Sequence, residues 1–332
     1  MQPQLNGLSI PLTTMRFVVR ADASRLIGSG HVMRCSAIAE ELIARGQEVV
    51  FVGKISDLSW VEARVASLGF SQIYNNPKDF NSNHKNDILI LDSYQIPVND
   101  KFILLEKWLH IITIVDELTP DYSCTLRIHP GLNPNWKGQS NVPILSGPQY
   151  IPFRASISKY PSEIAVHSQK IKIVVVAGGS DPFNLVLAIS NILTSFSDHF
   201  EAYLFSNKLN NFVSDSRFHL IEIGSSLDEV SRDANIVLTT SSTSSLEFIA
   251  RGLCVGIACA VDNQKQIYDE LGKLKAAAQI GFHTTASGWN LYTNTIHELI
   301  TESTFREALI NRSSGLIDFN GANRIVDAII SL

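Results

Sequence analysis

The first half of the chain alternates between short apolar runs and longer stretches in which apolar residues recur every three or four positions. The short runs predict buried parallel strands at 17–20, 48–52, 87–91 and 111–115. The longer stretches predict helices at 32–44, 57–68 and 100–108. Strands that alternate with helices in this way form a parallel sheet with helices on both faces.

The same alternation restarts after a region rich in Pro, Gly, Asn and Ser at 133–161, which we expect to link two domains. Further strands are predicted at 171–176, 201–205, 219–223, 236–239 and 254–258. Further helices are predicted at 182–196, 227–234, 244–251, 263–273, 289–302, 304–312 and 322–330. We therefore expect an N-terminal α/β domain at 15–150 and a C-terminal α/β domain at 160–332.

Doubly wound, Rossmann-like sheets bind ligands beyond the carboxyl ends of their strands. Each motif described below begins where a predicted strand ends. The expected architecture is thus α/β, with two doubly wound domains that face a central cleft.

Composition narrows the class of partner. The formal net charge of −5 does not indicate nucleic-acid binding, which favours a basic surface. No apolar run reaches the roughly 18–20 residues of a membrane span. Residues 1–14 lack the charged start and apolar block of a secretion signal, so we expect them to be a loose extension. Because the four cysteines are scattered without a CxxC pair, we expect a cytoplasmic protein with no disulfide framework and no metal site. The oligomeric state stays open.

A glycine-rich turn, Ile27-Gly-Ser-Gly-His31, joins the first strand to the first helix. Gly28 and Gly30 let the backbone and the positive helix end approach a ligand. The same helix end disfavours the imidazolium form of His31, so this residue could act as a general base. A histidine that only caps or packs is the alternative.

Two other polar residues of this segment have several possible roles. Asp22 could orient His31, bind a ligand hydroxyl or cap the turn. Arg34 lies one helical turn after His31 and could approach a phosphate, or pair with a carboxylate such as Glu40 or Glu41.

Acidic residues end two neighbouring strands of the first domain. Asp92-Ser93-Tyr94 follows the strand at 87–91, and Asp116-Glu117 follows the next one. Their side chains would converge on one edge of the sheet, where they could bind hydroxyls or hold a nucleophile. They could also be ordinary turn and N-cap residues.

The second domain offers two candidate phosphate sites. Gly178 and Gly179 precede a helix and allow close approach of a diphosphate, and Ser180 adds a hydroxyl. The run from Thr239 to Glu247 places more hydroxyls, including Ser244, at another helix start, where capping is the alternative role.

Three further side chains of the second domain suit a sugar. Glu247 could accept hydrogen bonds from two ribose hydroxyls, and the amides of Asn263 and Gln264 suit sugar hydroxyls. The turn before His31 lacks the third glycine of the dinucleotide fingerprint, so no nicotinamide cofactor is expected.

Together these motifs resemble the PseG family, UDP-2,4-diacetamido-2,4,6-trideoxy-β-L-altropyranose hydrolases of pseudaminic acid biosynthesis, which are related to MurG-type glycosyltransferases of the GT-B fold. The likeness covers nearly the whole chain after Met15. It rests on Arg20-Ala-Asp-Ala-Ser, Ile27-Gly-Ser-Gly-His31-Val-Met-Arg34-Cys, Asp92-x-Tyr94, Asp116, Gly147-Pro-x-Tyr150 with Arg154, Gly178-Gly-Ser-Asp181-Pro-x-Asn184, Ser244-x-x-Glu247, Asn263-Gln264 and Asp318-x-x-Gly321-x-x-Arg324.

The resemblance implies a GT-B fold and an inverting hydrolase that needs neither a metal nor a cofactor. His31 would activate a water that attacks the anomeric carbon and expels UDP, with Tyr94 near the sugar. The residues implied to hold UDP, the sugar or the diphosphate are Gly179, Ser180, Ser244, Glu247, Asn263 and Gln264.

Three departures from the family pattern bear on the sugar rather than the nucleotide. The family often has Asp-His-Tyr where this chain has Ser93 in the middle, and two aspartates where it has Asp116-Glu117. Arg154-Ala-Ser-Ile157 replaces an Arg-x-Glu-Phe segment. His31 is intact, which argues against a nucleotide-sugar binding protein without activity. A GT-B glycosyltransferase with an acceptor hydroxyl in place of water is the main alternative.

Overall fold

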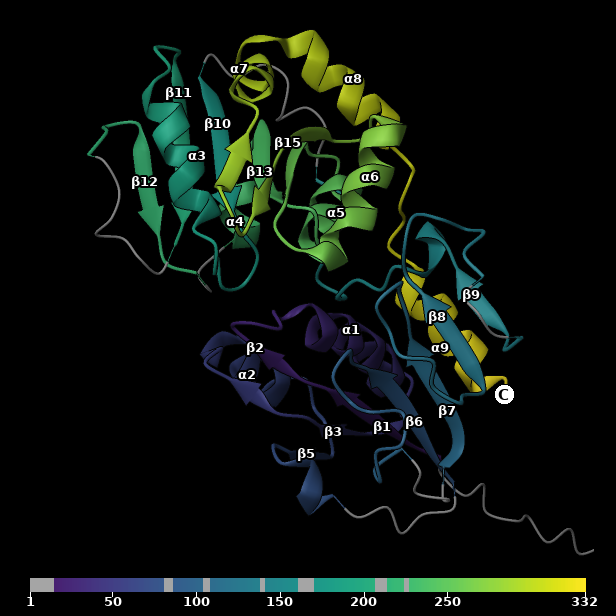
Figure 1. Ribbon diagram of the computed structural model, residues 1–332. Coiled ribbons are helices and arrows are strands. Elements are labelled where there is room, and N and C mark those ends of the chain that lie inside the picture. The colour runs from purple at the N-terminus through teal and green to yellow at the C-terminus, as the bar shows by residue number, and fades with distance from the viewer. Residues whose placement is uncertain are drawn as a thin grey trace, which may run out of the picture.

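The computed structural model describes residues 15–80, 86–103, 108–137, 141–160, 170–206, 214–223 and 227–332. The extension expected at 1–14 lies outside these ranges. The described residues form two seven-stranded sheets and one two-stranded sheet. Figure 1 shows them as two lobes, the first mostly purple to blue but including one yellow helix, and the second teal to yellow.

The first lobe is built on parallel strands in the order β5-β3-β1-β6-β7-β8-β9. The strands are β1 (Arg16–Ala21), β3 (Glu48–Val52), β5 (Gln72–Tyr74), β6 (Asp87–Asp92), β7 (Trp108–Ile114), β8 (Leu126–His129) and β9 (Ile144–Ser146). The other elements are α1 (Gly30–Ala44), α2 (Ser59–Ala66), the short pair β2 (Ala23–Ser24) and β4 (Ile55–Ser56), and the 3₁₀ turns η1 (Pro77–Asp79) and η2 (Pro148–Tyr150). The central strands β1 and β6 are buried on both faces, which explains their apolar sequences.

The second lobe repeats this plan with the strand order β12-β11-β10-β13-β14-β15-β16, in which only β16 runs antiparallel to its neighbour. Its strands are β10 (Ile171–Val176), β11 (Phe200–Phe205), β12 (Phe218–Ile221), β13 (Ile236–Thr240), β14 (Val255–Cys259), β15 (Ala278–Thr284) and β16 (Gly288–Leu291). Its helices are α3 (Leu185–Thr194), α4 (Leu227–Ser231), α5 (Thr243–Ala250), η4 (Asp262–Gln264), α6 (Lys265–Leu274), α7 (Thr293–Thr301) and α8 (Ser303–Ser313).

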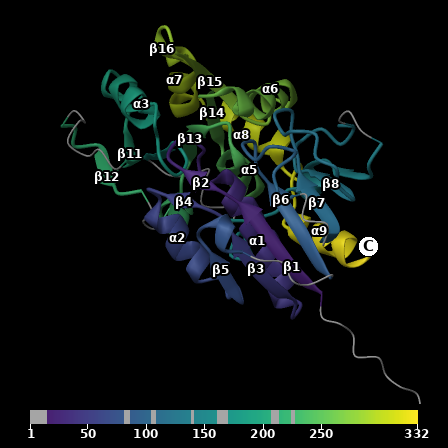
Figure 2. The same cartoon turned by 60° about the horizontal axis from the view of Figure 1, so that its bottom comes forward.

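The last helix, α9 (Gly321–Ile330), packs on the first lobe. Ile325, Val326 and Ile329 are buried in the same core as Phe17 and Phe51. Figures 1 and 2 both place this yellow helix and the C-terminus beside the blue strands of the first sheet. The domain boundaries expected from the sequence group this segment with the second half of the chain, whereas its apolar face completes the first core.

Two helix predictions differ from the structure. In the segment expected to be helical at 100–108, residues 101–103 form turns, Trp108 begins β7, and 104–107 lie outside the described residues. The helix expected at 289–302 begins only at Thr293, because Trp289 lies in the edge strand β16. Within the described ranges, no helix has the length and apolar character needed to cross a bilayer.

Candidate active site

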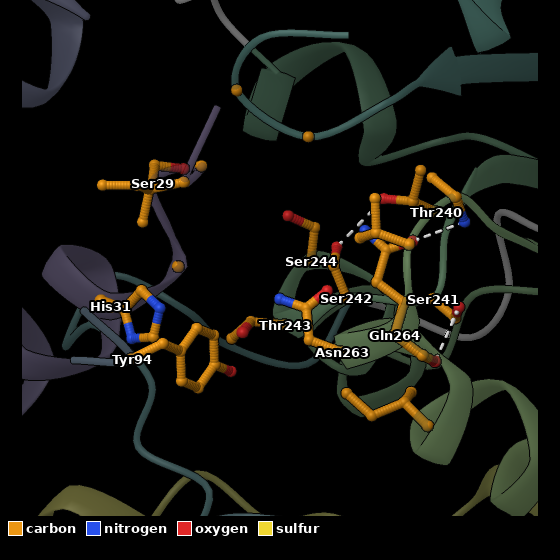
Figure 3. A pocket seen from close by; sticks show the side chains of 18 of the residues that line it. Ser29, His31, Tyr94, Thr240, Ser241, Ser242, Thr243, Ser244, Asn263 and Gln264 are labelled. Atoms are coloured by element: carbon orange, nitrogen blue, oxygen red, sulfur yellow. Dashed lines mark hydrogen bonds between the residues drawn. The ribbon is translucent and has the colours of Figure 1, made fainter. Parts of the chain in front are cut away.

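The carboxyl ends of both sheets face one cavity of about 420 Å³. Neighbouring strands β1, β6, β7 and β8 bring their C-terminal residues to it from the first lobe, and β10, β13 and β14 do so from the second. The cavity brings together these residues expected from the sequence: Asp22, Gly28, Gly30, His31, Arg34, Asp92, Tyr94, Gly178, Gly179, Ser180, Ser244, Asn263 and Gln264. In Figure 3, His31 and Tyr94 face Asn263 and the hydroxyl-rich segment of the second lobe.

His31 lies in the first turn of α1 and is held by Asp92 at the end of β6. Its Nδ1 is 2.6 Å from Asp92 Oδ1, and both side chains are almost wholly buried. Because an ionised carboxylate only accepts hydrogen bonds, Nδ1 carries the proton, and the lone pair of the neutral ring is on Nε2. This is the tautomer that a general base requires.

Arg34 keeps Asp92 ionised in this buried position. Its Nη2 donates to Asp92 Oδ1 at 2.6 Å, and its Nε donates to Oδ2. Burial alone would raise the pKa of Asp92, but the charge of Arg34 and the hydrogen bonds from Arg34 and His31 lower it to about 2. Arg34 Nη2 also lies 3.2 Å from His31 Nδ1, but these two groups are both donors, so the contact is not a hydrogen bond.

Tyr94 packs against His31 and is anchored by Asp116. The two rings meet edge to face with centroids 4.4 Å apart, and the Tyr94 hydroxyl donates to Asp116 Oδ2. Burial and the carboxylate of Asp116 raise the pKa of Tyr94, so it remains a neutral phenol. Tyr94 and Asp116 therefore form one wall of the cavity and restrict the orientation of His31.

Asp22 does not orient His31. Its carboxylate is held by two hydrogen bonds from Arg20, at 2.6 and 2.8 Å, and by the backbone N–H of Lys54 at 2.7 Å. The carboxylate therefore secures the loop after β1, although Asp22 still lines the cavity. Likewise, Arg34 pairs with Asp92 rather than with Glu40 or Glu41. Glu40 accepts from Arg64 on α2, and Glu41 accepts from Arg45 just after α1.

The two candidate phosphate sites of the second lobe differ in one respect. At the start of α3, Asp181 accepts from the N–H groups of Leu185 and Val186 at 2.8 and 3.2 Å, so a carboxylate of the chain already occupies that helix end. At α5 the N-cap residue Ser242 makes no side-chain capping bond, and the segment 240–244 lines the cavity. The start of α5 has no acidic residue in its first turn and no side-chain cap from Ser242.

The glycine turn at 178–179 packs against the first lobe. Gly178 has φ +69°, which a residue with a Cβ adopts only with strain, and a Cβ at Gly179 would come within 2.6 Å of the Trp60 ring. The hydroxyl of Ser180 lies 3.3 Å from the carbonyl oxygen of Arg25. The turn therefore brings the backbone of the second lobe close to the loop that carries His31.

Glu247 does not line the cavity. It lies on α5 one turn beyond Ser244, and its Oε2 is 3.5 Å from Nη2 of Arg154 in the segment between the lobes. Burial and the neighbouring Asp228 raise its pKa to about 7, although Arg154 opposes the shift. The sequence predicted that this carboxylate lies on the helix after the run of hydroxyls, but it could not show which way the side chain turns.

Asn263 and Gln264 lie in η4, directly before α6. Both line the cavity opposite His31, and Gln264 Oε1 also accepts from the N–H of Ala260 at 2.9 Å. This bond fixes the loop after β14, so the amide of Asn263 is presented on a rigid turn.

The cavity also has lining residues that sequence reasoning missed, among them His129 and Gln266. His129 ends a four-residue strand with only two apolar residues, which gave no strand signal. Within the described part of the chain, no group of three or more His, Cys, Asp or Glu side chains is placed to hold a metal ion.

No family model matches the chain. A curated relative, an uncharacterized protein of Methanocaldococcus jannaschii, is 24% identical over 77% of this chain. The match covers 58% of that protein, so the chain spans little more than half the length of its relative.

Solved structures resemble nearly the whole chain. The kitacinnamycin glycotransferase superposes with a TM-score of 0.63 at 13% identity, covering 96% of this chain and 98% of its own. MurG of Acinetobacter baumannii gives 0.62 at 11% identity over 96% and 100%. The spinosyn rhamnosyltransferase SpnG, solved with thymidine diphosphate, gives 0.61 at 12% identity over 94% and 100%. The fold is that of the GT-B class, with two Rossmann-like domains.

Proposed function

We propose that the protein breaks the bond between the anomeric carbon of a sugar and the diphosphate of a nucleotide, using an oxygen nucleophile that His31 deprotonates. The observation that most strongly supports this is the His31–Asp92 pair on one side of a cavity whose other side holds the uncapped start of α5. A base and an anion site on opposite sides of a bound sugar suit inversion at the anomeric carbon.

The proposed step uses residues of the first lobe for proton transfer. The O–H of the nucleophile gives its proton to Nε2 of His31 while its oxygen bonds to the anomeric carbon. The bond from that carbon to the diphosphate oxygen breaks, and its electron pair leaves with the nucleotide. Asp92 stabilises the imidazolium that forms, because its pKa of about 2 keeps it ionised at neutral pH.

The proposed leaving group is held by the second lobe. The first N–H groups of α5, together with the hydroxyls of Ser242, Thr243 and Ser244, would bind the diphosphate, and the helix dipole favours its negative charge. Gly178 and Gly179 would let the backbone approach the same group. Asn263 and Gln264 line the side of the cavity opposite His31, where their amides would contact the sugar.

Glu247 is proposed to bind the ribose after turning from Arg154. Its contact with Arg154 is long, at 3.5 Å, and its raised pKa indicates that the ionised carboxylate is poorly compensated. Two ribose hydroxyls would donate hydrogen bonds to this carboxylate and favour its ionised form.

Two nucleophiles are compatible with this arrangement. Transfer to an acceptor hydroxyl is the first candidate, because the similar solved structures include glycosyltransferases such as MurG and SpnG. Hydrolysis by water is the second, and the motif from Arg20 to Arg34, which resembles the UDP-sugar hydrolases of pseudaminic acid biosynthesis, favours it.

The test is release of nucleotide from a panel of UDP- and TDP-linked sugars, including 2,4-diacetamido-trideoxy sugars, with and without added acceptor alcohols. Release without an acceptor supports hydrolysis, and release that depends on an acceptor supports transfer. The H31A variant should bind UDP, and its release of nucleotide should fall by about 10²–10⁴. If no sugar nucleotide is turned over, or if H31A is fully active, the proposal is wrong.

A further inference from the structure

A second cavity, of about 320 Å³, lies beside the candidate active site. The two cavities share Val115 and Asp116, which directly follow β7. The other residues that line the second cavity also belong to the first lobe, which carries His31: Glu117, Thr119, Pro120, Asp121, Arg127 and Trp136. A volume of this size falls within the range of about 300–1,000 Å³ that is usual for small-molecule sites.

Asp116 connects the second cavity to the base. Its Oδ1 accepts from the Leu118 N–H at 3.0 Å and from the Thr119 hydroxyl at 3.1 Å, and its Oδ2 accepts from the Tyr94 hydroxyl. Because each carboxylate oxygen has two lone pairs, Oδ2 can accept one more hydrogen bond. Tyr94 packs edge to face on His31, so a ligand bonded to Asp116 would lie one aromatic ring away from the base.

Trp136 gives the second cavity a fixed aromatic wall. Its Nε1 donates to Glu117 Oε1 at 2.9 Å. The His129 ring covers one face of the indole, with centroids 4.5 Å apart and planes 3° from parallel, and Ser146 Oγ lies 3.1 Å from His129 Nδ1. Trp136 is half-buried and held in place, so its remaining surface offers an apolar wall to the C–H groups of a ligand.

Arg127 adds a hydrogen-bond donor to this cavity. Its side chain is 7% exposed, and its Nη2 donates to Asp121 and, at 3.4 Å, to the carbonyl oxygen of Tyr122. Within the described part of the chain, its Nε makes no hydrogen bond. The guanidinium therefore has donor capacity that the protein itself does not use.

The polar groups of the cavity define the chemistry of its ligand. Three carboxylates, those of Asp116, Glu117 and Asp121, only accept hydrogen bonds, whereas the guanidinium of Arg127 only donates. A hydroxyl group satisfies both kinds of partner, since it donates and accepts. Three negative charges against one positive charge also repel an anionic ligand.

We propose that the second cavity binds the acceptor whose hydroxyl His31 deprotonates, and that this acceptor is an uncharged sugar or polyol. This inference rests on the proposed function and selects transfer over hydrolysis. The acceptor hydroxyls bond to the carboxylates and to Arg127, and its C–H groups pack on Trp136. One hydroxyl extends past Asp116 and gives its proton to His31 Nε2, while its oxygen bonds to the anomeric carbon and the nucleotide leaves with the electron pair.

The test is acceptor-dependent release of nucleotide from a sugar nucleotide that the protein turns over. The probes are the methyl glycosides of glucose, galactose, mannose and N-acetylglucosamine, together with the 6-phosphates of the same glycosides. Neutral glycosides should stimulate release. Their phosphates should show at least about fivefold lower kcat/KM, because two like charges about 4 Å apart weaken binding by about this factor even in water.

Two variants test the assigned side chains. W136A removes the apolar wall and should raise KM for the neutral acceptor about tenfold, while KM for the sugar nucleotide changes less than about twofold. E117K reverses a charge at an exposed position and should reduce the discrimination against phosphates about tenfold. E62K is the matched control, because Glu62 is an exposed residue of α2 that lines neither cavity, and it should change neither value. If W136A does not fold, E117K still tests the proposal.

The outcomes distinguish this inference from the function on which it rests. Nucleotide release that no glycoside stimulates overturns the acceptor site and leaves the proposed function standing with water as the nucleophile. Parental acceptor kinetics in both W136A and E117K also overturn the acceptor site alone. A protein that turns over no sugar nucleotide, with or without glycosides, overturns the proposed function and this inference with it.

Discussion

Replacing Asp92 with Asn tests the catalytic assignment most sharply. Arg34 donates to both oxygens of Asp92, and His31 Nδ1 donates to one of them. An Asn side chain must turn its NH₂ group toward one of these donors. If it faces His31, the imidazole proton moves to Nε2 and the lone pair needed for catalysis is lost. Turnover should then fall by about 10²–10⁴, as expected when a base is held in the wrong tautomer.

The same substitution lowers stability by an amount that can be worked from the structure. The pKa of Asp92 is about 2, which is roughly 2 units below that of an ordinary aspartate and corresponds to about 2–3 kcal/mol at neutral pH. The uncompensated Arg34 adds to this, so we expect a loss of about 3–5 kcal/mol. D92N/R34M removes both charges and should recover much of this stability without recovering turnover.

Asp87 provides a matched control. It is at the other end of the same strand β6, is fully buried, and accepts two hydrogen bonds from Arg16 at 3.0 and 2.6 Å. D87N should lose a similar amount of stability in urea unfolding while kcat stays within about twofold, measured on the folded fraction. A D92N variant with parental kcat, or a D87N variant with the same catalytic loss as D92N, would refute the reasoning.

Four further outcomes are expected. H31A should lose about 10²–10⁴ in turnover while UDP affinity by calorimetry stays within twofold, because the base does not touch the diphosphate. S242A/S244A should weaken UDP binding about tenfold, whereas D181N, which affects the cap of α3, should lower stability by about 1 kcal/mol and leave UDP affinity unchanged. UDP affinity should rise as pH increases through about 7, where Glu247 ionises, and E247Q should abolish this dependence; a flat parental profile would exclude the ribose role. Acid unfolding should show the Asp92 contribution, which is complete above pH 4 and is lost as pH falls from about 4 to about 2.

The sequence predicted the two doubly wound domains because unbroken apolar runs such as that in β6 are typical of parallel strands buried on both faces. It missed short edge strands such as β9 (Ile144–Ser146), which carry too few residues for a periodic signal. It also could not assign α9 to the first core, since amphipathic spacing shows that a helix packs but not on which sheet.

The sequence likewise predicted some features of the candidate site and missed others. Strand-end reasoning brought His31, Asp92 and Tyr94 to one cavity, since carboxyl ends of parallel strands share an edge. It offered Asp22 as the residue that orients His31, whereas Asp92 does so, because Arg20 holds the carboxylate of Asp22. The orientation of Glu247 could not be predicted either, because it depends on Arg154, which is 93 residues away in the chain.

The most direct test of the central claim is the fate of ¹⁸O during turnover of a sugar nucleotide. Hydrolysis in ¹⁸O-water should place the heavy oxygen on the free sugar and none on UDP. Transfer should place the oxygen of an ¹⁸O-labelled acceptor alcohol in the new glycosidic bond. Heavy oxygen recovered in the phosphate of UDP would show cleavage at phosphorus and would contradict attack at the anomeric carbon by a nucleophile activated by His31.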